Sequence, residues 1–95
     1  MTLKTLQILQ VFLRSANDEM SGYQIFKAIN VQSGTLYPVL KRFETVGWLS
    51  SRWEDIDASV EGRPRKRLYK LTAQGRRCAM EQLESHFGSG VLQGC

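Results

Sequence analysis

The densest group of chemically active side chains in this 95-residue sequence is a basic segment, residues 63–77. It contains seven cations and no acid: Arg63, Arg65, Lys66, Arg67, Lys70, Arg76 and Arg77. The preceding segment, residues 54–61, contains four acids, so charges are segregated along the chain although the net charge is only +4. A segregated basic segment is typical of a surface that binds phosphate groups. A solvated surface without a partner is the alternative interpretation.

A second group of polar side chains lies in the segment QSGTLYPVLKRFETVGW, residues 32–48. Its apolar residues recur at spacings of three and four, which predicts a helix with one buried face: Leu36, Val39, Leu40, Phe43 and Val46. Ser33 is expected to cap this helix, and Gly47 is expected to end it. Pro38 costs little so close to the helix start, because few N–H groups there have partners.

Two further helices are predicted on the N-terminal side of these groups. The spacing predicts a helix over residues 3–16, with a buried face of Leu3, Leu6, Leu9, Phe12, Leu13 and Ala16 that Ile8 and Val11 widen. A short second helix begins at Ser21, where Gln24 can complete a capping box. Its expected core contacts are Ile25, Phe26 and Ile29.

Strand-like alternation follows the third helix at residues 48–54 and again at 65–71, with a polar loop between them. The pair predicts a long-looped hairpin. Thr72 then caps a last helix, with one face formed by Ala73, Met80, Leu83 and Phe87. These elements predict a mainly α fold with a small β-hairpin, in the order α-α-α-β-β-α of a winged helix-turn-helix. The expected domain spans residues 1–87, and residues 88–95 form a flexible tail.

Three segments carry a family resemblance: GYQI (22–25), GTLYPVLKRFETVGWL (34–49) and GRPRKRLYKLTAQGRR (62–77). Together they resemble the PadR family of winged helix-turn-helix transcriptional regulators in bacteria, over roughly residues 3–85. The chain looks like a short form of that family, with a short link before the third helix and a truncated C-terminal helix. The resemblance implies a transcriptional regulator, and the short C-terminal helix, a departure from the family, is expected to leave no separate effector domain.

Residues and resemblance together predict sequence-specific binding of double-stranded DNA. In a winged helix the third helix lies in the major groove and the hairpin, or wing, reaches along the duplex. The predicted DNA-binding residues are Tyr23, Ser33, Thr35, Tyr37, Pro38, Lys41, Arg63, Arg65, Lys66 and Arg67. For Tyr37, a position half inside the core is the rival interpretation. Arg42 is instead expected to pair with Glu44 or Glu54.

The apolar residues of the first and last helices exceed what one small core needs, which indicates a partner surface. The predicted interface of a homodimer, with a dimerisation helix from about residue 72, comprises Leu3, Ile8, Val11, Met80, Leu83 and Phe87. Such a dimer would present two recognition helices about 34 Å apart and read an inverted repeat. The resemblance further implies that the protein represses transcription by blocking a promoter.

Two alternative functions stay open: a winged helix that binds a protein, and a small-molecule-sensing regulator with an aromatic pocket at the dimer interface. Against the second, Trp48 and Trp53 are both expected to be core residues. An RNA-binding version is disfavoured by the narrow major groove of A-form RNA. No catalytic arrangement, metal cluster or cofactor motif is recognisable, so we expect neither an enzyme nor a cofactor. Without a membrane-length apolar run or a signal peptide, a cytoplasmic location is expected.

Overall fold

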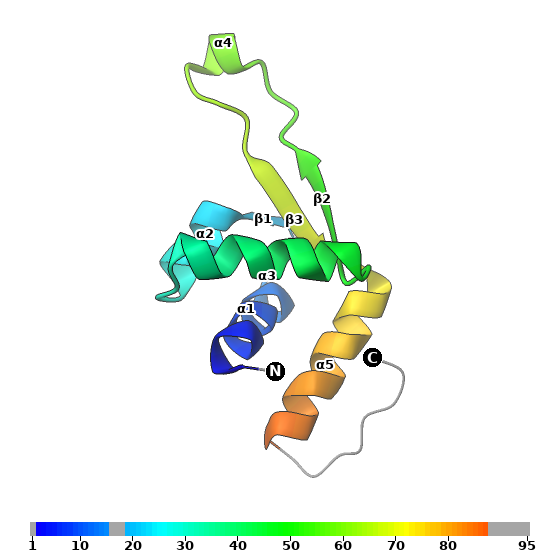
Figure 1. Ribbon diagram of the computed structural model, residues 1–95. Coiled ribbons are helices and arrows are strands. Elements are labelled where there is room, and N and C mark those ends of the chain that lie inside the picture. The colour runs from blue at the N-terminus through cyan, green and yellow to red at the C-terminus, as the bar shows by residue number, and fades with distance from the viewer. Residues whose placement is uncertain (1, 16–18, 88–95) are drawn as a thin grey trace.

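The computed structural model of the chain describes residues 2–15 and 19–87, with side chains described as far as residue 84. Ala16 and the predicted flexible tail therefore lie outside the described residues. The elements follow one another as α1 (Leu3–Arg14), β1 (Glu19–Ser21), α2 (Gly22–Ala28), α3 (Ser33–Thr45), β2 (Leu49–Trp53), α4 (Ala58–Glu61), β3 (Arg67–Leu71) and α5 (Ala73–Phe87) (Figure 1). The predicted order of helices and hairpin is confirmed, with β1 and α4 added to it.

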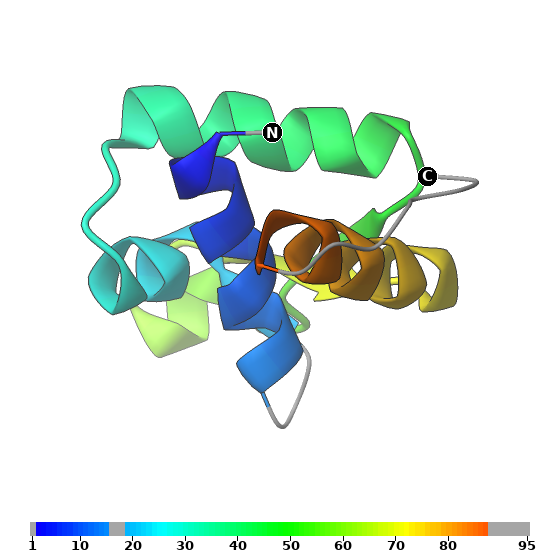
Figure 2. The same cartoon turned by 90° about the horizontal axis from the view of Figure 1, so that it is seen from below.

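The hydrophobic core lies among the helices, and α1 is at its centre. Figure 2 shows α1 between α2 and α5, and both neighbours contact it. The largest side chains that are fully buried are Ile8, Leu9, Phe12, Ile25, Leu36, Leu40 and Cys78. The apolar face predicted for α3 is therefore buried, except for Val46, which is 52% exposed.

Local sequence signals account for the start of α2 and the end of α3. The predicted capping box is present: the Ser21 N–H donates to Gln24 Oε1 at 2.8 Å, and the Gln24 N–H donates to Ser21 Oγ at 3.2 Å. Gly47 has a φ of 86°, a left-handed conformation that glycine adopts without strain, and α3 ends just before it. The expectation for Ser33 is wrong: the N-cap of α3 is Gln32, and Ser33 is the first helical residue.

The wing belongs to a three-stranded antiparallel sheet with the order β1-β3-β2, not to a two-stranded hairpin. β1 pairs with β3, placing Met20 opposite Tyr69, and β2 pairs with the other edge of β3, placing Ser51 opposite Tyr69. An ion pair joins the outer strands: Arg52 Nε lies 2.7 Å from Glu19 Oε2 and lowers the pKa of the Glu19 carboxyl group. The third strand explains why the short hairpin is stable in this orientation, since an isolated hairpin is marginal in water.

The junction of α3, β2 and α5 is tightly packed. Trp48 is buried, and its ring stacks on Phe43 with centroids 5.1 Å apart. The Thr72 hydroxyl group donates to the Gly47 carbonyl oxygen at 2.6 Å and accepts from the Gly75 N–H at 2.9 Å, which confirms Thr72 as a cap of α5. Only glycine fits at position 75, because an added Cβ would lie 2.8 Å from Trp48 Cα. The junction therefore fixes the sheet relative to α3.

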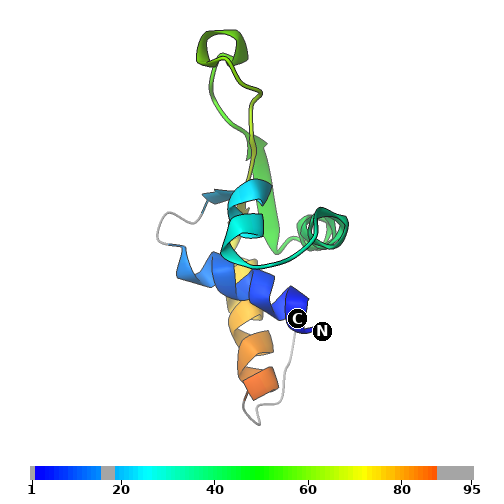
Figure 3. The same ribbon diagram turned by 90° about the vertical axis from the view of Figure 1, so that its left-hand side faces the viewer.

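Several predicted core positions are wrong. Leu3, Phe26 and Trp53 are 58%, 46% and 59% exposed, respectively. A helix of seven residues such as α2 turns only one narrow stripe toward the core, and Ile25 occupies it. Trp53 lies at the last position of β2, where the wing extends away from the helices (Figure 3).

Among the described residues, no helix combines the length and the apolar character needed to cross a membrane.

Candidate nucleic-acid interface

The exposed side of α3 carries the side chains that the sequence predicts for base and backbone contacts. Its buried residues fix the rotation of the helix, so that Ser33, Thr35, Pro38 and Lys41 are all exposed. Tyr37 is 48% exposed, so about half of its side chain is accessible to a partner and the other half is covered by the protein. These residues come from the first three turns of α3, the part of a recognition helix that meets base edges.

The N-terminus of α3 has no side-chain cap. The N–H groups of Thr35 and Leu36 both donate to the Gln32 carbonyl oxygen at 2.9 Å. Within the described part of the chain, the N–H groups of Ser33 and Gly34 have no hydrogen-bond partner. Uncapped N–H groups at a helix start attract anions such as phosphate, so this end of α3 suits contact with a nucleic-acid backbone.

The wing extends from the helical body as two arms joined by the short helix α4 (Figure 1, Figure 3). α4 replaces the unstructured loop expected there. Asp57 caps it by accepting from the Ser59 N–H at 3.0 Å, and Gly62 ends it with a φ of 70°. The acids Asp55, Asp57 and Glu61 lie around this tip, and the cations at positions 65–67 lie nearer the sheet. Positive charge is therefore concentrated at the base of the wing.

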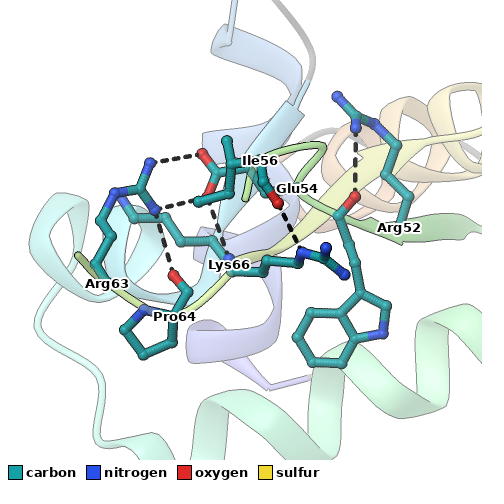
Figure 4. A network of polar contacts seen from close by, with 8 residues as sticks. Arg52, Glu54, Ile56, Arg63, Pro64 and Lys66 are labelled. Atoms are coloured by element: carbon teal, nitrogen blue, oxygen red, sulfur yellow. Dashed lines mark hydrogen bonds and ion pairs between the residues drawn. The ribbon is translucent and has the colours of Figure 1, made fainter. Parts of the chain in front are cut away.

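Glu54 holds the two arms of the wing together. Its carboxylate accepts from Arg63 at 2.7 and 3.1 Å and from the Lys66 N–H at 3.2 Å (Figure 4). The Glu54 N–H donates to the Lys66 carbonyl oxygen at 2.8 Å. A further bond joins the same two arms: Arg65 Nε donates to the Ile56 carbonyl oxygen at 2.8 Å. The guanidinium group of Arg63, predicted to contact DNA, is thus occupied by an ion pair inside the wing.

The Glu54 carboxyl group is expected to titrate at unusually low pH. Its hydrogen bonds with Arg63 lower its pKa from 4.5 to about 2, so the ion pair stabilises the folded wing above pH 4.5, and this contribution is lost as the pH falls through about 2. In carboxyl-detected NMR titrations, the midpoint of Glu54 should rise toward 4.5 in Arg63→Gln. Glu19, which pairs with Arg52, should titrate unchanged in that variant. A wild-type midpoint near 4.5 would show that the ion pair does not form in solution.

Arg67 connects the wing to the far end of α3. Its guanidinium group lies over the ring of Trp53, 5.0 Å from the centroid, and Arg67 Nη2 lies 3.8 Å from Glu44 Oε2. Glu44 also accepts a hydrogen bond from the Ser51 hydroxyl group on β2. The expected pairing of Arg42 with Glu44 or Glu54 is not found, because Arg67 and Arg63 take those carboxylates; Arg42 forms no ion pair within the described residues.

A pocket of about 230 Å³ lies where α2, α3 and the base of the wing meet. The start of α2 lines one side with Tyr23, Tyr37 comes from α3, and residues 65–67 come from the wing. All three parts of the fold that carry predicted DNA-binding residues, α2, α3 and the wing, therefore meet at one place. Lys41 and Ser33 lie elsewhere on α3, outside the lining of this pocket.

Sequence reasoning missed the residues that position the interface. Three carboxylates hold the wing by a bond to a basic or hydroxyl side chain: Glu54, Glu44 and Glu19. A glycine, Gly22, allows Tyr37 to lie against α2. The segregation of acids and cations into two adjacent segments was the only available signal for the Glu54–Arg63 pair. The others join segments that no local pattern relates.

The fold and the exposed side of α3 define a winged helix-turn-helix protein of the kind found among transcriptional regulators. More particularly, the chain belongs to the transcriptional regulator PadR-like family, whose model matches residues 8–81. The predicted resemblance is therefore confirmed. The members and structural neighbours of this class are regulators, not enzymes.

Solved structures share the fold at low sequence identity. The chain is similar to a PadR-like transcription factor from Bacteroides fragilis (TM-score 0.72, 23% identity, covering 90% of this chain and 80% of that one). A PadR-family transcriptional regulator from Eggerthella lenta gives a TM-score of 0.68 at 24% identity over 88% of this chain and 70% of that one. The structure of Bacillus subtilis PadR in complex with operator DNA gives a TM-score of 0.71 at 20% identity. The match covers 100% of this chain and 51% of that one. No curated protein sequence matches the chain.

Proposed function

We propose that this protein is a sequence-specific, double-stranded-DNA-binding repressor that acts as a homodimer on an inverted repeat. The observation that carries the proposal is that Tyr37, from the exposed side of α3, and the basic residues at the base of the wing line one pocket. A recognition helix in the major groove with a basic wing beside it would place both on the same duplex. The Bacillus subtilis PadR structure, which contains operator DNA, has this fold.

The proposed contacts divide into base readout and backbone positioning. Thr35, Ser33 and Lys41 are exposed on α3 and provide donors for base edges or nearby phosphates. Pro38 supplies an apolar contact for a thymine methyl group or a sugar. Tyr23, Tyr37, Arg65 and Lys66 serve the backbone. Arg63 and Arg67 contribute positive charge while their bonds to Glu54 and Glu44 shape the wing.

The proposed dimer uses the exposed side of α1 and α5, which pack beside each other. Leu3 and Met80 are each 58% exposed, and Val11 and Leu83 are half-buried. Ile8 was predicted for this interface, but it is fully buried in the core and unavailable to a partner. The side chain of Phe87 lies outside the described residues. Exposed apolar side chains on neighbouring helices are what a second copy would cover.

Selection from a random-sequence duplex library, followed by sequencing of the bound fraction, tests the DNA-binding proposal. We expect an enriched inverted repeat with half-sites one helical turn apart, and two chains for each duplex in analytical ultracentrifugation.

Met80→Lys should weaken binding to the full repeat much more than to one half-site. A promoter carrying the repeat should be transcribed less in vitro when protein is added. Absence of binding at low salt would contradict the proposal, and enrichment of a single half-site would contradict the dimer.

A further inference from the structure

A second pocket, of about 430 Å³, lies between α1, β1 and the end of α2. α1 and α2 pack beside each other, and the pocket opens between them (Figure 2). Its volume is within the range of small-molecule sites in proteins, roughly 300–1,000 Å³. None of the described residues that line it belongs to the candidate nucleic-acid interface. A ligand in this pocket would therefore serve a purpose other than contact with DNA.

One wall of the pocket is a polar row on α1. Gln7, Gln10 and Arg14 follow one another at spacings of three and four, which places them on one face of the helix. Within the described residues, none of these three side chains has a hydrogen-bond or ion-pair partner. The row therefore offers two amide groups and one guanidinium group to a ligand.

Gln7 has an amide oxygen, Oε1, that is buried without a hydrogen-bond donor. Among the described residues it is the only buried side-chain oxygen or nitrogen in this state. A buried polar atom without a partner is costly, so most such atoms in folded proteins are satisfied by protein, water or a bound group. Because the terminal torsion of a glutamine side chain is soft, a small rotation presents this oxygen to the pocket that Gln7 lines. A ligand that donates an N–H or O–H group there would satisfy it.

The opposite wall of the pocket is apolar. It consists of Met20 from β1 and of Ala28 and Ile29 at the end of α2. Val11, which the proposed dimer surface also uses, adds an apolar contact from α1. The methionine side chain adapts to irregular shapes, which suits a variable ligand body. Met20 also lies opposite Tyr69 in the pairing of β1 with β3, so the pocket borders the strand that attaches the wing.

The charge of the lining selects the sign of the ligand. Arg14 is the only charged residue among the described residues that line the pocket, and its side chain is exposed. It lies about two helical turns from Gln7, or about 10 Å along α1. A carboxylate pairs with a guanidinium group through two hydrogen bonds, whereas a cation would meet positive charge that no lining carboxylate offsets.

We infer that this pocket binds a small organic carboxylate that has an apolar body and, at the end opposite the carboxylate, an N–H or O–H donor. Gln7 accepts from the donor, Arg14 pairs with the carboxylate, and the apolar wall covers the body between them. The inference goes beyond the proposed function and does not depend on it, because it concerns other residues and a ligand of another class.

Isothermal titration calorimetry with indole-3-butyrate tests the inference, because this probe carries an N–H group and a carboxylate at opposite ends of an apolar body. The wild type should bind one probe molecule for each chain. Two analogues remove one feature each: 1-methylindole-3-butyrate lacks the donor, and indole-3-butyramide lacks the charge. Each analogue should bind about tenfold more weakly than the parent probe.

Variants of the protein assign each feature of the probe to one residue. Gln7→Leu should bind indole-3-butyrate about tenfold more weakly, and methylation of the probe nitrogen should then have no further effect. Arg14→Ala should likewise abolish the difference between the carboxylate and the carboxamide probes. Arg77→Ala, which removes an exposed cation on α5 outside the pocket, should bind all three probes as the wild type does.

Two checks distinguish loss of binding from loss of folding. Gln7→Leu should not lower the free energy of unfolding in urea, because it removes the buried oxygen that has no partner. Ala28→Phe leaves Gln7 and Arg14 unchanged and adds a ring at an exposed position of the lining. This ring should occupy the pocket and abolish binding, while the protein stays folded in circular dichroism.

Four outcomes would overturn the inference. The first is absence of saturable binding of indole-3-butyrate to the wild type. Equal binding of the methylated and parent probes would show that Gln7 does not accept from the ligand. Equal losses in Arg77→Ala and Arg14→Ala would show a general electrostatic attraction. Probe-induced NMR shifts centred on the exposed side of α5, in place of the lining residues, would show binding at the proposed dimer surface. DNA binding by the same protein would be unaffected by any of these results.

Discussion

Replacing Arg65 and Lys66 together by alanine is expected to lower DNA affinity by between tenfold and a hundredfold at moderate salt. Both side chains lie at the base of the wing, and their terminal nitrogens are free of partners within the described residues. Each cation that contacts a phosphate releases condensed counterions, so removing two should also reduce the slope of log affinity against log salt by roughly 1.8. Fluorescence anisotropy with the selected duplex, over a salt series, measures both quantities.

A charge-matched control separates this local effect from a change in net charge. Lys4→Ala combined with Arg14→Ala also removes two exposed cations, but both lie on α1, away from the wing. This control should change affinity only slightly. Equal losses in the two double variants would indicate a general electrostatic attraction without a specific wing contact. The replacement of Arg65 and Lys66 should not affect the fold strongly, because both side chains are exposed.

Trp48→Ala is expected to destabilise the protein by about 3–5 kcal/mol, enough to unfold much of a small domain. The Trp48 side chain is 7% exposed and stacks on Phe43, and its backbone carbonyl oxygen accepts from the Thr72 N–H at 2.9 Å. Removal of the ring would leave a cavity at the point where α3, β2 and α5 meet. Urea unfolding followed by circular dichroism at 222 nm measures the loss.

Trp53→Ala is the matched control, because it deletes the same side chain five residues later in the sequence. Trp53 is 59% exposed, and its ring contacts Arg67. Its removal should cost about 0.5–1 kcal/mol, the range of an exposed cation–π contact. Equal destabilisation by the two variants would contradict the placement of Trp48 in the core and of Trp53 on the surface.

The local elements of this fold could be predicted from the sequence because each depends on residues only a few positions apart. The Ser21–Gln24 capping box, the buried face of α3 and the left-handed Gly47 that ends α3 are all of this kind. The predicted DNA-binding residues of α3 are exposed for the same reason, since burial of one helical face determines the position of the other. Composition and spacing therefore indicated the class of protein.

The tertiary structure alone decided how the wing is attached and which of its cations are free. β1 is only three residues long, too short for a periodic signal, and it exists because β3 offers an edge for pairing. The basic segment looks uniform in the sequence, yet Glu54 binds Arg63 while Lys66 Nζ has no partner in the described part of the chain. The contact of Tyr37 with Gly22 likewise joins two helices. Side-chain pairing and close packing between segments depend on distances that only the folded chain establishes, so no pattern within one segment could reveal them.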